Sequence, residues 1–165
     1  MATPIPALSS CKARMTSEEE RLAERLEGKL DNDPHCVTKP FTIADHLGQA
    51  HQEGHAWVDM AILCTDWKTM DLRAKALAQR KLPFNVRKRS GDFNPGANAI
   101  QVMTMKVSKG LEFPVVALPG VGHMPAEGED DKEAARVFYV TATRATQKLI
   151  VTTYGQGAFG RRLGS

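Results

Sequence analysis

The chain has 165 residues, of which 42% are hydrophobic and 25% are charged, and its formal net charge is +3. This composition is typical of a globular domain and argues against an intrinsically disordered chain. No apolar run is long enough to span a bilayer and the N-terminus does not resemble a signal peptide, so we expect a cytoplasmic protein without a membrane partner. The small positive charge permits nucleic-acid binding but does not by itself indicate it.

Residues 1–34 predict an N-terminal extension that carries one helix. Thr16 stands two residues before three consecutive glutamates, a pattern that favours a helix start, because the hydroxyl can cap the helix and the acids favour its positive end. A thin apolar stripe follows at four-residue spacing, at Leu22, Leu26 and Leu30. Pro34 ends this helix.

Residues 35–155 predict one α/β domain, and its first half alternates short apolar runs with amphipathic segments. In order, we expect a short strand at Val37–Phe41, a helix capped by Thr42 and ending near His51, a buried strand at Val58–Cys64, and a helix from Trp67 to Arg80 capped by Asp66. On the last helix, Met70, Ala74 and Leu77 have the spacing of a core-facing stripe.

The second half continues the alternation up to a predicted flexible tail at 156–165. We expect an edge strand at Phe84–Lys88, a loop at Ser90–Asn98, a strand at Ile100–Thr104, a turn at Lys106–Gly110, a strand at Pro114–Leu118, a segment at Glu133–Ala145 and a strand at Leu149–Thr153. Strands alternating with helices indicate a mostly parallel sheet with helices on both faces. Ligands bind beyond the carboxyl ends of such strands, where we expect Lys106, Lys109, Glu112 and Arg144.

One segment, Arg136–Thr143, has an ambiguous pattern. Its β-branched and aromatic residues favour a strand by propensity. Its acidic lead-in and the spacing of Ala134, Val137, Phe138 and Thr141 favour a helix. We interpret it as a helix, a choice that the family resemblance described below decides.

The chain contains no G-x-x-x-x-G-K-[ST] sequence and no acidic motif of the kind that holds magnesium. A complete nucleotide-hydrolysing motor needs both features, so this chain alone is not expected to hydrolyse ATP. The three cysteines are widely spaced and odd in number, at Cys11, Cys36 and Cys64. They predict reduced thiols, with Cys64 buried in a strand, and neither a disulfide framework nor a metal site.

The histidines also offer a possible metal motif. His51 and His55 stand four residues apart with Glu53 between them, and His46 lies one turn earlier. Gly54 interrupts the helix, and the acid is not where H-E-x-x-H places it. We therefore expect surface histidines and no metal.

Two segments carry a family resemblance. The segment TMKVSKGLEF, Thr104–Phe113, resembles motif V of the UvrD/Rep-type superfamily 1 DNA helicases, T-x-H-x-x-K-G-L-E-F, and FYVTATRA, Phe138–Ala145, resembles their motif VI, Y-V-A-x-T-R-A. The close match covers 99–153, with a weaker match back to about residue 57. The resemblance implies the second RecA-like motor domain, called 2A, with the three-layer fold of P-loop NTPases. The short loop at 90–98 implies that the large 2B insertion is absent at this place.

The resemblance also implies roles for individual residues. Arg144 would reach the γ-phosphate of ATP, Glu112 would contact the ribose, and Gly110 would let the backbone approach the nucleotide closely. Thr104 and Lys106 would contact phosphates of single-stranded DNA, with lysine replacing the usual histidine. ATP would be shared with an N-terminal RecA-like motor domain of the same full-length protein, which would also hold Mg²⁺.

Motif IV departs from the family pattern. The resemblance aligns Cys64-Thr65-Asp66-Trp67 with Y-R-T-N, whose arginine would also reach the γ-phosphate, and Thr65 cannot supply that charge. Lys68 or Arg73 would substitute, or one arginine would suffice, or the domain is impaired.

Each residue also has a simpler interpretation: Arg144 as a solvated arginine, Glu112 as a surface acid and Lys106 as a solvated lysine in a turn. At the level of the protein, the helicase hypothesis stands beside a non-catalytic RecA-like module that binds nucleic acid or protein, and beside a structural remnant.

Overall fold

A computed structural model describes residues 43–163 except 90, 93, 95 and 154. The described chain folds as two compact units. The sheet unit contains residues 39–119 and 144–150, and the helical unit contains 120–143 and the segment from 151 onward, besides residues that are not described. The predicted extension at 1–34, the strand at 37–41 and the cap at Thr42 lie outside the described residues.

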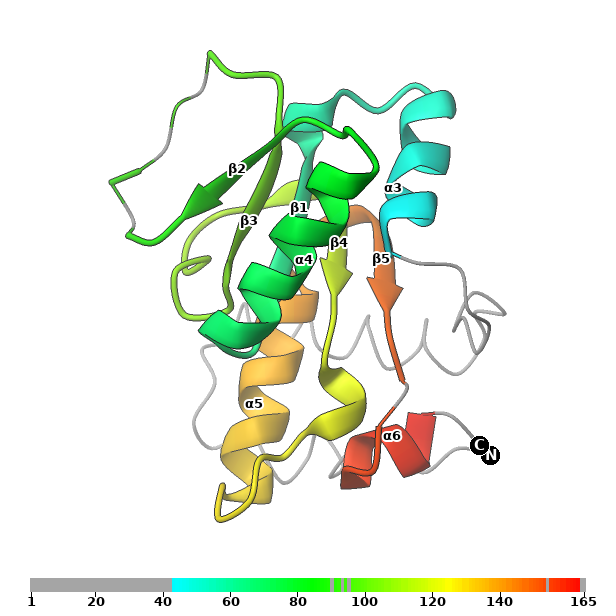
Figure 1. Ribbon diagram of the computed structural model, residues 1–165. Helices are drawn as coiled ribbons and strands as arrows, with labels where there is room; N and C mark the ends of the chain where they lie inside the picture. Colours follow the sequence, from blue (N-terminus) through cyan, green and yellow to red (C-terminus); the bar gives the residue numbers. More distant parts are fainter. Residues whose placement is uncertain (1–42, 90, 93, 95, 154, 164–165) are drawn as a thin grey trace. The chain divides into compact units, whose positions relative to one another are not determined.

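The sheet unit is built on a five-stranded parallel sheet (Figure 1). Its strands are β1 (Met60–Cys64), β2 (Phe84–Arg87), β3 (Ile100–Thr104), β4 (Phe113–Leu118) and β5 (Ala145–Val151), in the order β2-β3-β1-β4-β5. β1 pairs in parallel with both β3 and β4, and β2 pairs in parallel with β3. The predicted α/β fold with a parallel sheet is therefore confirmed, and β2 lies at the edge as expected.

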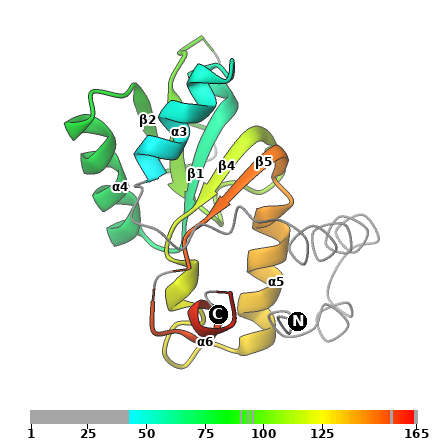
Figure 2. The same cartoon turned by 90° about the vertical axis from the view of Figure 1, so that its right-hand side faces the viewer.

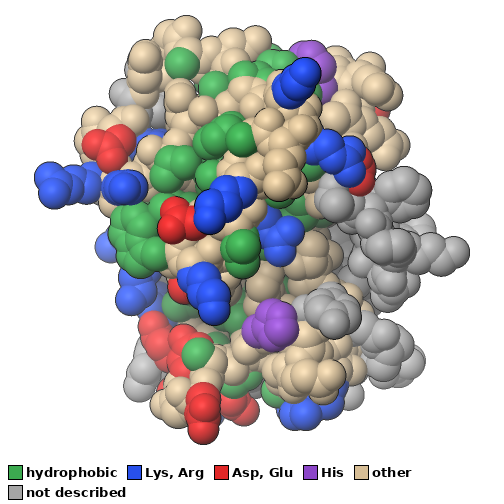
Figure 3. Space-filling model, viewed as in Figure 1, with side chains coloured by type: hydrophobic (Ala, Val, Ile, Leu, Met, Phe, Trp, Pro, Cys, Tyr) green, Lys and Arg blue, Asp and Glu red, His purple; other side chains and the backbone are tan. Residues whose placement is uncertain are grey.

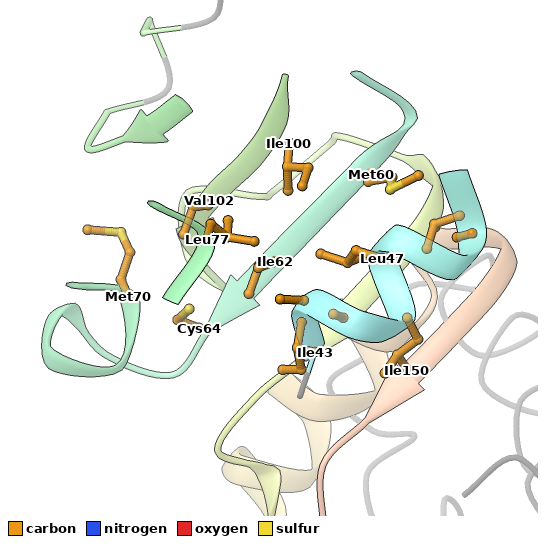
Figure 4. Packing of buried hydrophobic residues seen from close by; sticks show 14 residues of the cluster. Ile43, Leu47, Met60, Ile62, Cys64, Met70, Leu77, Ile100, Val102 and Ile150 are labelled. Atoms are coloured by element: carbon orange, nitrogen blue, oxygen red, sulfur yellow. The ribbon is translucent and has the colours of Figure 1, made fainter. Parts of the chain in front are cut away.

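Two helices, α3 (Ile43–Gln52) and α4 (Trp67–Gln79), lie on one side of this sheet (Figure 2). The hydrophobic core fills the space between these helices and the sheet (Figure 4). Alternate residues of β1 point into this core, as strand geometry requires. Leu47 of α3 and Leu77 of α4 are almost fully buried there. All five residues of β1 are buried, which is typical of a central strand covered on both faces.

The start of α4 is fixed by its N-cap, as the sequence predicts. The carboxylate of Asp66 accepts hydrogen bonds from the Thr69 N–H (2.8 Å), the Thr69 hydroxyl (2.9 Å) and the Thr65 hydroxyl (2.8 Å). Partial burial raises the pKa of Asp66, but these hydrogen bonds outweigh it and hold the pKa below its ordinary value. The charged cap therefore stabilises the folded helix.

The expected bounds of two strands are wrong. β1 begins at Met60 instead of Val58, because Trp57–Asp59 form the 3-10 turn η2, in which the Asp59 carboxylate accepts from the Ala56 N–H (3.2 Å). β5 covers Ala145–Val151 instead of 149–153. Its residues 146–148 are polar, and Thr146 and Gln147 are exposed, so a search for an apolar run misses the start of the strand.

The helical unit contains α5 (Asp131–Ala142), the 3-10 turn η3 (Val121–His123) and α6 (Ala158–Leu163). In α5, Asp130 caps the helix by accepting from the N–H groups of residues 132 and 133. The helix predicted over the motif VI segment is thus confirmed, and the N-terminal cap prevails over the β propensity.

α6 occupies part of the segment predicted as a flexible tail. Its Phe159 is buried and its N–H donates to the Met124 carbonyl (3.0 Å). At Gly160, a Cβ atom would lie 2.5 Å from the Gly122 carbonyl oxygen, so the contact between α6 and η3 requires glycine. A six-residue helix has too few turns to give a readable periodicity, so the sequence pattern does not predict α6.

Within the described residues, no helix combines the length and the hydropathy that crossing a bilayer requires.

Candidate functional site

The residues that motif V singles out lie in or next to one connection, the loop at 105–112 between β3 and β4. β3 ends at Thr104, which pairs with Cys64, the last residue of β1. β4 begins at Phe113, and its Val115 pairs with Met60, the first residue of β1. The loop therefore leaves the carboxyl end of the sheet and returns to the amino end (Figure 1).

The strand register sets the distance between these two ends. Phe113 lies two strand residues before the level of Met60, and Thr104 lies at the level of Cys64, four residues after it. The two levels are therefore six residues apart, or about 20 Å at the usual rise of a β-strand. The motif residues before and after this loop thus form two groups, one at each end of the sheet.

The amino-end group consists of Glu112 and Arg144. The Phe113 N–H donates to the Arg144 carbonyl oxygen at 2.8 Å, so the backbones of residues 112 and 144 are neighbours. Glu112 is exposed, and Arg144 is half-buried. The Arg144 Nε is buried and has no hydrogen-bond partner within the described part of the chain.

Gly110 lies in the turn that follows β3, where the Ser108 N–H donates to the Thr104 carbonyl (3.3 Å) and the Leu111 N–H donates to the Ser108 carbonyl (3.0 Å). The φ of Gly110, +79°, lies in the left-handed region, which glycine adopts without strain. A Cβ built there meets no atom within 4 Å. The residue is exposed, so the main chain at this point is open to a ligand.

The carboxyl-end group consists of Thr104 and Lys106. Thr104 is nearly buried, and its carbonyl accepts from the N–H groups of Val107 (3.0 Å) and Ser108 (3.3 Å). The Ser108 hydroxyl donates to the Met105 carbonyl (2.7 Å). These bonds form a compact turn that holds Lys106 exposed beyond the end of β3.

The expectation that all these side chains gather at the carboxyl ends of the strands is wrong for Glu112 and Arg144. Each stands immediately before a strand, β4 or β5, and so lies at the amino end. Lys106 lies at the carboxyl end as expected.

Thr65 also lies at the carboxyl end, one residue beyond β1. Thr65 lies seven residues beyond the level of Phe113, or about 23 Å along the strands. Position 65 and Arg144 therefore lie at opposite ends of the sheet. The Thr65 hydroxyl instead donates to Asp66 (2.8 Å).

The two proposed substitutes for this charge lie on α4. Lys68 is exposed in the first turn of the helix, and Arg73 is half-buried. Burial raises the pKa of the Cys64 thiol to about 12, and the positive charge of Arg73 opposes that rise. Arg73 is thus close to the end of β1, so it does not supply charge to the amino-end group. Cys64 is a buried, unreactive thiol.

The histidines of the suggested metal motif have other partners. The His51 ring stacks on Trp57, with centroids 3.8 Å apart, and its Nδ1 lies 2.8 Å from the His55 carbonyl oxygen. Glu53 forms an ion pair with Lys148 at 2.7 Å. No cluster of three potential ligands of the His, Cys, Asp and Glu types occurs in the described ranges.

Comparison with known proteins supports the motif assignment. Residues 87–156 match the sequence profile of the UvrD-like helicase C-terminal domain. The resemblance seen in motifs V and VI is therefore confirmed over this range, which contains both the amino-end and the carboxyl-end group.

Relatives of known name agree with this UvrD-like assignment. The chain is 43% identical over 79 residues to the ATP-dependent DNA helicase PcrA of Leuconostoc citreum, covering 44% of this chain and 10% of that protein. It is 41% identical over 69 residues to DNA helicase II of Escherichia coli K12, covering 38% and 10%. The matched part of the chain thus spans about a tenth of the length of these relatives.

A solved structure supports the fold. The C-terminal domain of a possible DNA helicase from Lactobacillus plantarum aligns with a TM-score of 0.52 and 15% identity, over 87% of this chain and 74% of that one. At this identity the likeness concerns the fold alone.

One surface feature beside the carboxyl-end group was not predicted. Trp67, the first residue of α4, is 50% exposed. The signal was available, because Trp67 directly follows the N-cap and falls outside the stripe of Met70, Ala74 and Leu77.

Proposed function

We propose that this chain is the 2A portion of an ATP-dependent DNA helicase or translocase. In this proposal the amino-end group completes an ATP site whose P-loop and Mg²⁺ belong to an N-terminal RecA-like motor domain, and the carboxyl-end group contacts single-stranded DNA. The observation that carries the proposal is the hydrogen bond from the Phe113 N–H to the Arg144 carbonyl, which joins motifs V and VI.

The amino-end group fits a nucleotide. The partly buried guanidinium of Arg144 has an Nε atom without a protein acceptor among the described residues, and a phosphate oxygen would satisfy it. Glu112 is an exposed acceptor beside it, suited to a sugar hydroxyl. Gly110, in the turn that precedes Glu112, offers an exposed and unobstructed backbone that a nucleotide would approach.

The role of Arg144 follows from its permanent charge and forked donors. Bound ATP would supply the phosphoryl transfer, during which negative charge accumulates on the transferred group. Arg144 would stabilise that charge from the side opposite the P-loop domain, and Glu112 would orient the sugar. ATP turnover would thus require both domains to close on the nucleotide.

The carboxyl-end group suits a phosphate backbone. Lys106 is an exposed cation on a hydrogen-bonded turn, and its charge favours phosphate without reading base sequence. The separation of about 20 Å between the groups, from the strand register, keeps the two ligands apart. Domain closure on ATP would then move the DNA-binding end as part of the same rigid sheet.

The test is DNA-stimulated ATP hydrolysis by the chain alone and by the chain joined to an N-terminal RecA-like motor domain. We expect turnover only in the joined protein, and a loss of about 10³- to 10⁵-fold for Arg144→Ala. Arg89→Ala is the matched control, because Arg89 is an exposed arginine in a loop. Normal turnover by Arg144→Ala would refute the role of this arginine.

The alternative is a non-catalytic RecA-like module that binds nucleic acid or protein. Thr65, which stands where the family pattern has an arginine, favours this alternative. It predicts that the joined protein binds single-stranded DNA with no DNA-stimulated ATP hydrolysis.

A further inference from the structure

Trp67 is an unusually exposed side chain at the carboxyl end of the sheet. Among the described residues, only Trp67 and Leu72 are large hydrophobic side chains with high exposure, at 50% and 56%. Tryptophan carries a large apolar surface that folding normally buries. Figure 3 shows hydrophobic side chains exposed among lysines and arginines on the face that α4 covers.

Trp67 lies next to the carboxyl-end group. The Met105 N–H donates to the Cys64 carbonyl at 2.9 Å, which extends the pairing of β1 and β3 beyond the last paired residues. Lys106 follows Met105 by one residue, and Trp67 follows Cys64 by three residues. An exposed indole and an exposed ammonium thus leave the same end of adjacent parallel strands.

The position of Trp67 is fixed in advance. The Asp66 carboxylate holds the first turn of α4 through its hydrogen bonds to Thr65 and Thr69. A side chain displayed on a fixed turn loses little backbone freedom on binding, which favours its use as a contact surface.

The local charges indicate which part of a nucleic acid would meet Trp67. Lys68, Lys106 and Lys109 are exposed near this end, whereas Asp66 and Asp71 place negative charge on the first turns of α4. Phosphates are therefore favoured at the turn that carries Lys106 and Lys109, whereas on the first turns of α4 the charge of Lys68 is offset by Asp66 and Asp71. A base, which is uncharged and presents a flat face, fits the indole.

We propose that Trp67 is a stacking platform for a base of the single-stranded DNA whose phosphates Lys106 contacts. The inference rests on the proposed function, because it deepens the DNA contact assigned to the carboxyl-end group. Stacking of bases on aromatic side chains is tolerant of sequence, as translocation along any strand would require.

The experiment measures binding of the full chain to a fluorescent single-stranded oligonucleotide across a series of salt concentrations. We expect Trp67→Ala to weaken binding by about 5- to 150-fold with an unchanged salt slope, since no charge is removed. Lys106→Ala should instead reduce the slope of log K against log salt by about 0.7. Leu72→Ala is the matched control on the same helix and should bind normally.

Two further measurements separate stacking from other roles. An abasic oligonucleotide of equal length retains the phosphates, so the parent and Trp67→Ala should bind it equally. The chain has two tryptophans, and Trp57→Phe leaves Trp67 as the single reporter. Its fluorescence should be quenched when the base-containing strand binds.

The outcomes distinguish the inference from the proposed function. Normal binding by Trp67→Ala, with weaker binding by Lys106→Ala, overturns the stacking role and leaves the DNA contact standing. No binding by the parent chain overturns both. If Trp67→Ala keeps its DNA affinity but loses association with an N-terminal motor domain, Trp67 is a protein contact and the stacking role is overturned.

Discussion

The charged cap of α4 gives a sharp test of how this structure holds its carboxyl-end surface. Asp66→Ala removes the acceptor for the Thr69 N–H, which lies at 2.8 Å, and for the two hydroxyl donors of Thr65 and Thr69. Replacement of an N-cap aspartate by alanine costs about 0.5–2 kcal/mol. Because Thr65 is exposed and Thr69 partly so, water can replace some of the lost bonds, and we expect about 1 kcal/mol. For a chain of this size that corresponds to a decrease in Tm of roughly 2–4 °C.

The effect should depend on pH in a defined direction. The folded-state pKa of Asp66 is lowered, so the group contributes stability above its unfolded pKa, about 3.9, and that stability is lost as the pH falls through the folded value. The free energy of unfolding of the parent should therefore exceed that of Asp66→Ala at pH 6–7. The difference should shrink below about pH 4. Urea unfolding at several pH values, monitored by circular dichroism, measures it.

Asp66→Asn is the matched control, since asparagine caps a helix about as well as aspartate but does not titrate. It should remain within a few tenths of a kcal/mol of the parent near neutral pH. No loss of stability in Asp66→Ala, or a gap between the parent and Asp66→Ala that is the same at pH 3 and pH 7, would refute the role given to the charged cap.

Three other predictions follow from packing and register. Leu47→Ala, in the buried core, should lower the free energy of unfolding by about 2–5 kcal/mol, and Leu72→Ala, exposed on α4, by less than about 0.5 kcal/mol, both measured by urea unfolding. Gly160→Ala should lower Tm because a new Cβ would lie 2.5 Å from a carbonyl oxygen of η3, whereas Gly48→Ala meets no atom and should raise Tm by removing a glycine from a helix. Thr65→Arg should leave the ATP turnover of the joined protein unchanged, because position 65 lies at the carboxyl end of the sheet; a clear gain in turnover would contradict the register argument.

Local sequence signals predict most elements of the sheet unit. The helix predicted from Asp66 to Arg80 is found at Trp67–Gln79, because an acid that can cap is followed by an apolar stripe of helical period. β3 has the bounds expected from its apolar run. The predicted start of β5, Leu149, is later than its observed start, Ala145. Edge strands are partly exposed to solvent, so their polar residues obscure the alternation of apolar and polar positions. α6 is too short for periodicity to show, and tertiary contacts determine it.

The end of the sheet at which each residue lies is harder to obtain from local signals, but for Glu112 it could have been derived. If β3 and β4 are parallel, the chain that leaves the carboxyl end of one must return to the amino end of the other. Glu112 immediately precedes an apolar run in the sequence, so a parallel sheet already requires it at the amino end, opposite Lys106. The nine steps from Thr104 to Phe113 allow about 31 Å of extended chain, enough for the roughly 20 Å between the two levels without an intervening helix. The position of Arg144 along the strands could not be derived in this way. It follows from the hydrogen bond between Phe113 and Arg144, which are 31 positions apart in the sequence.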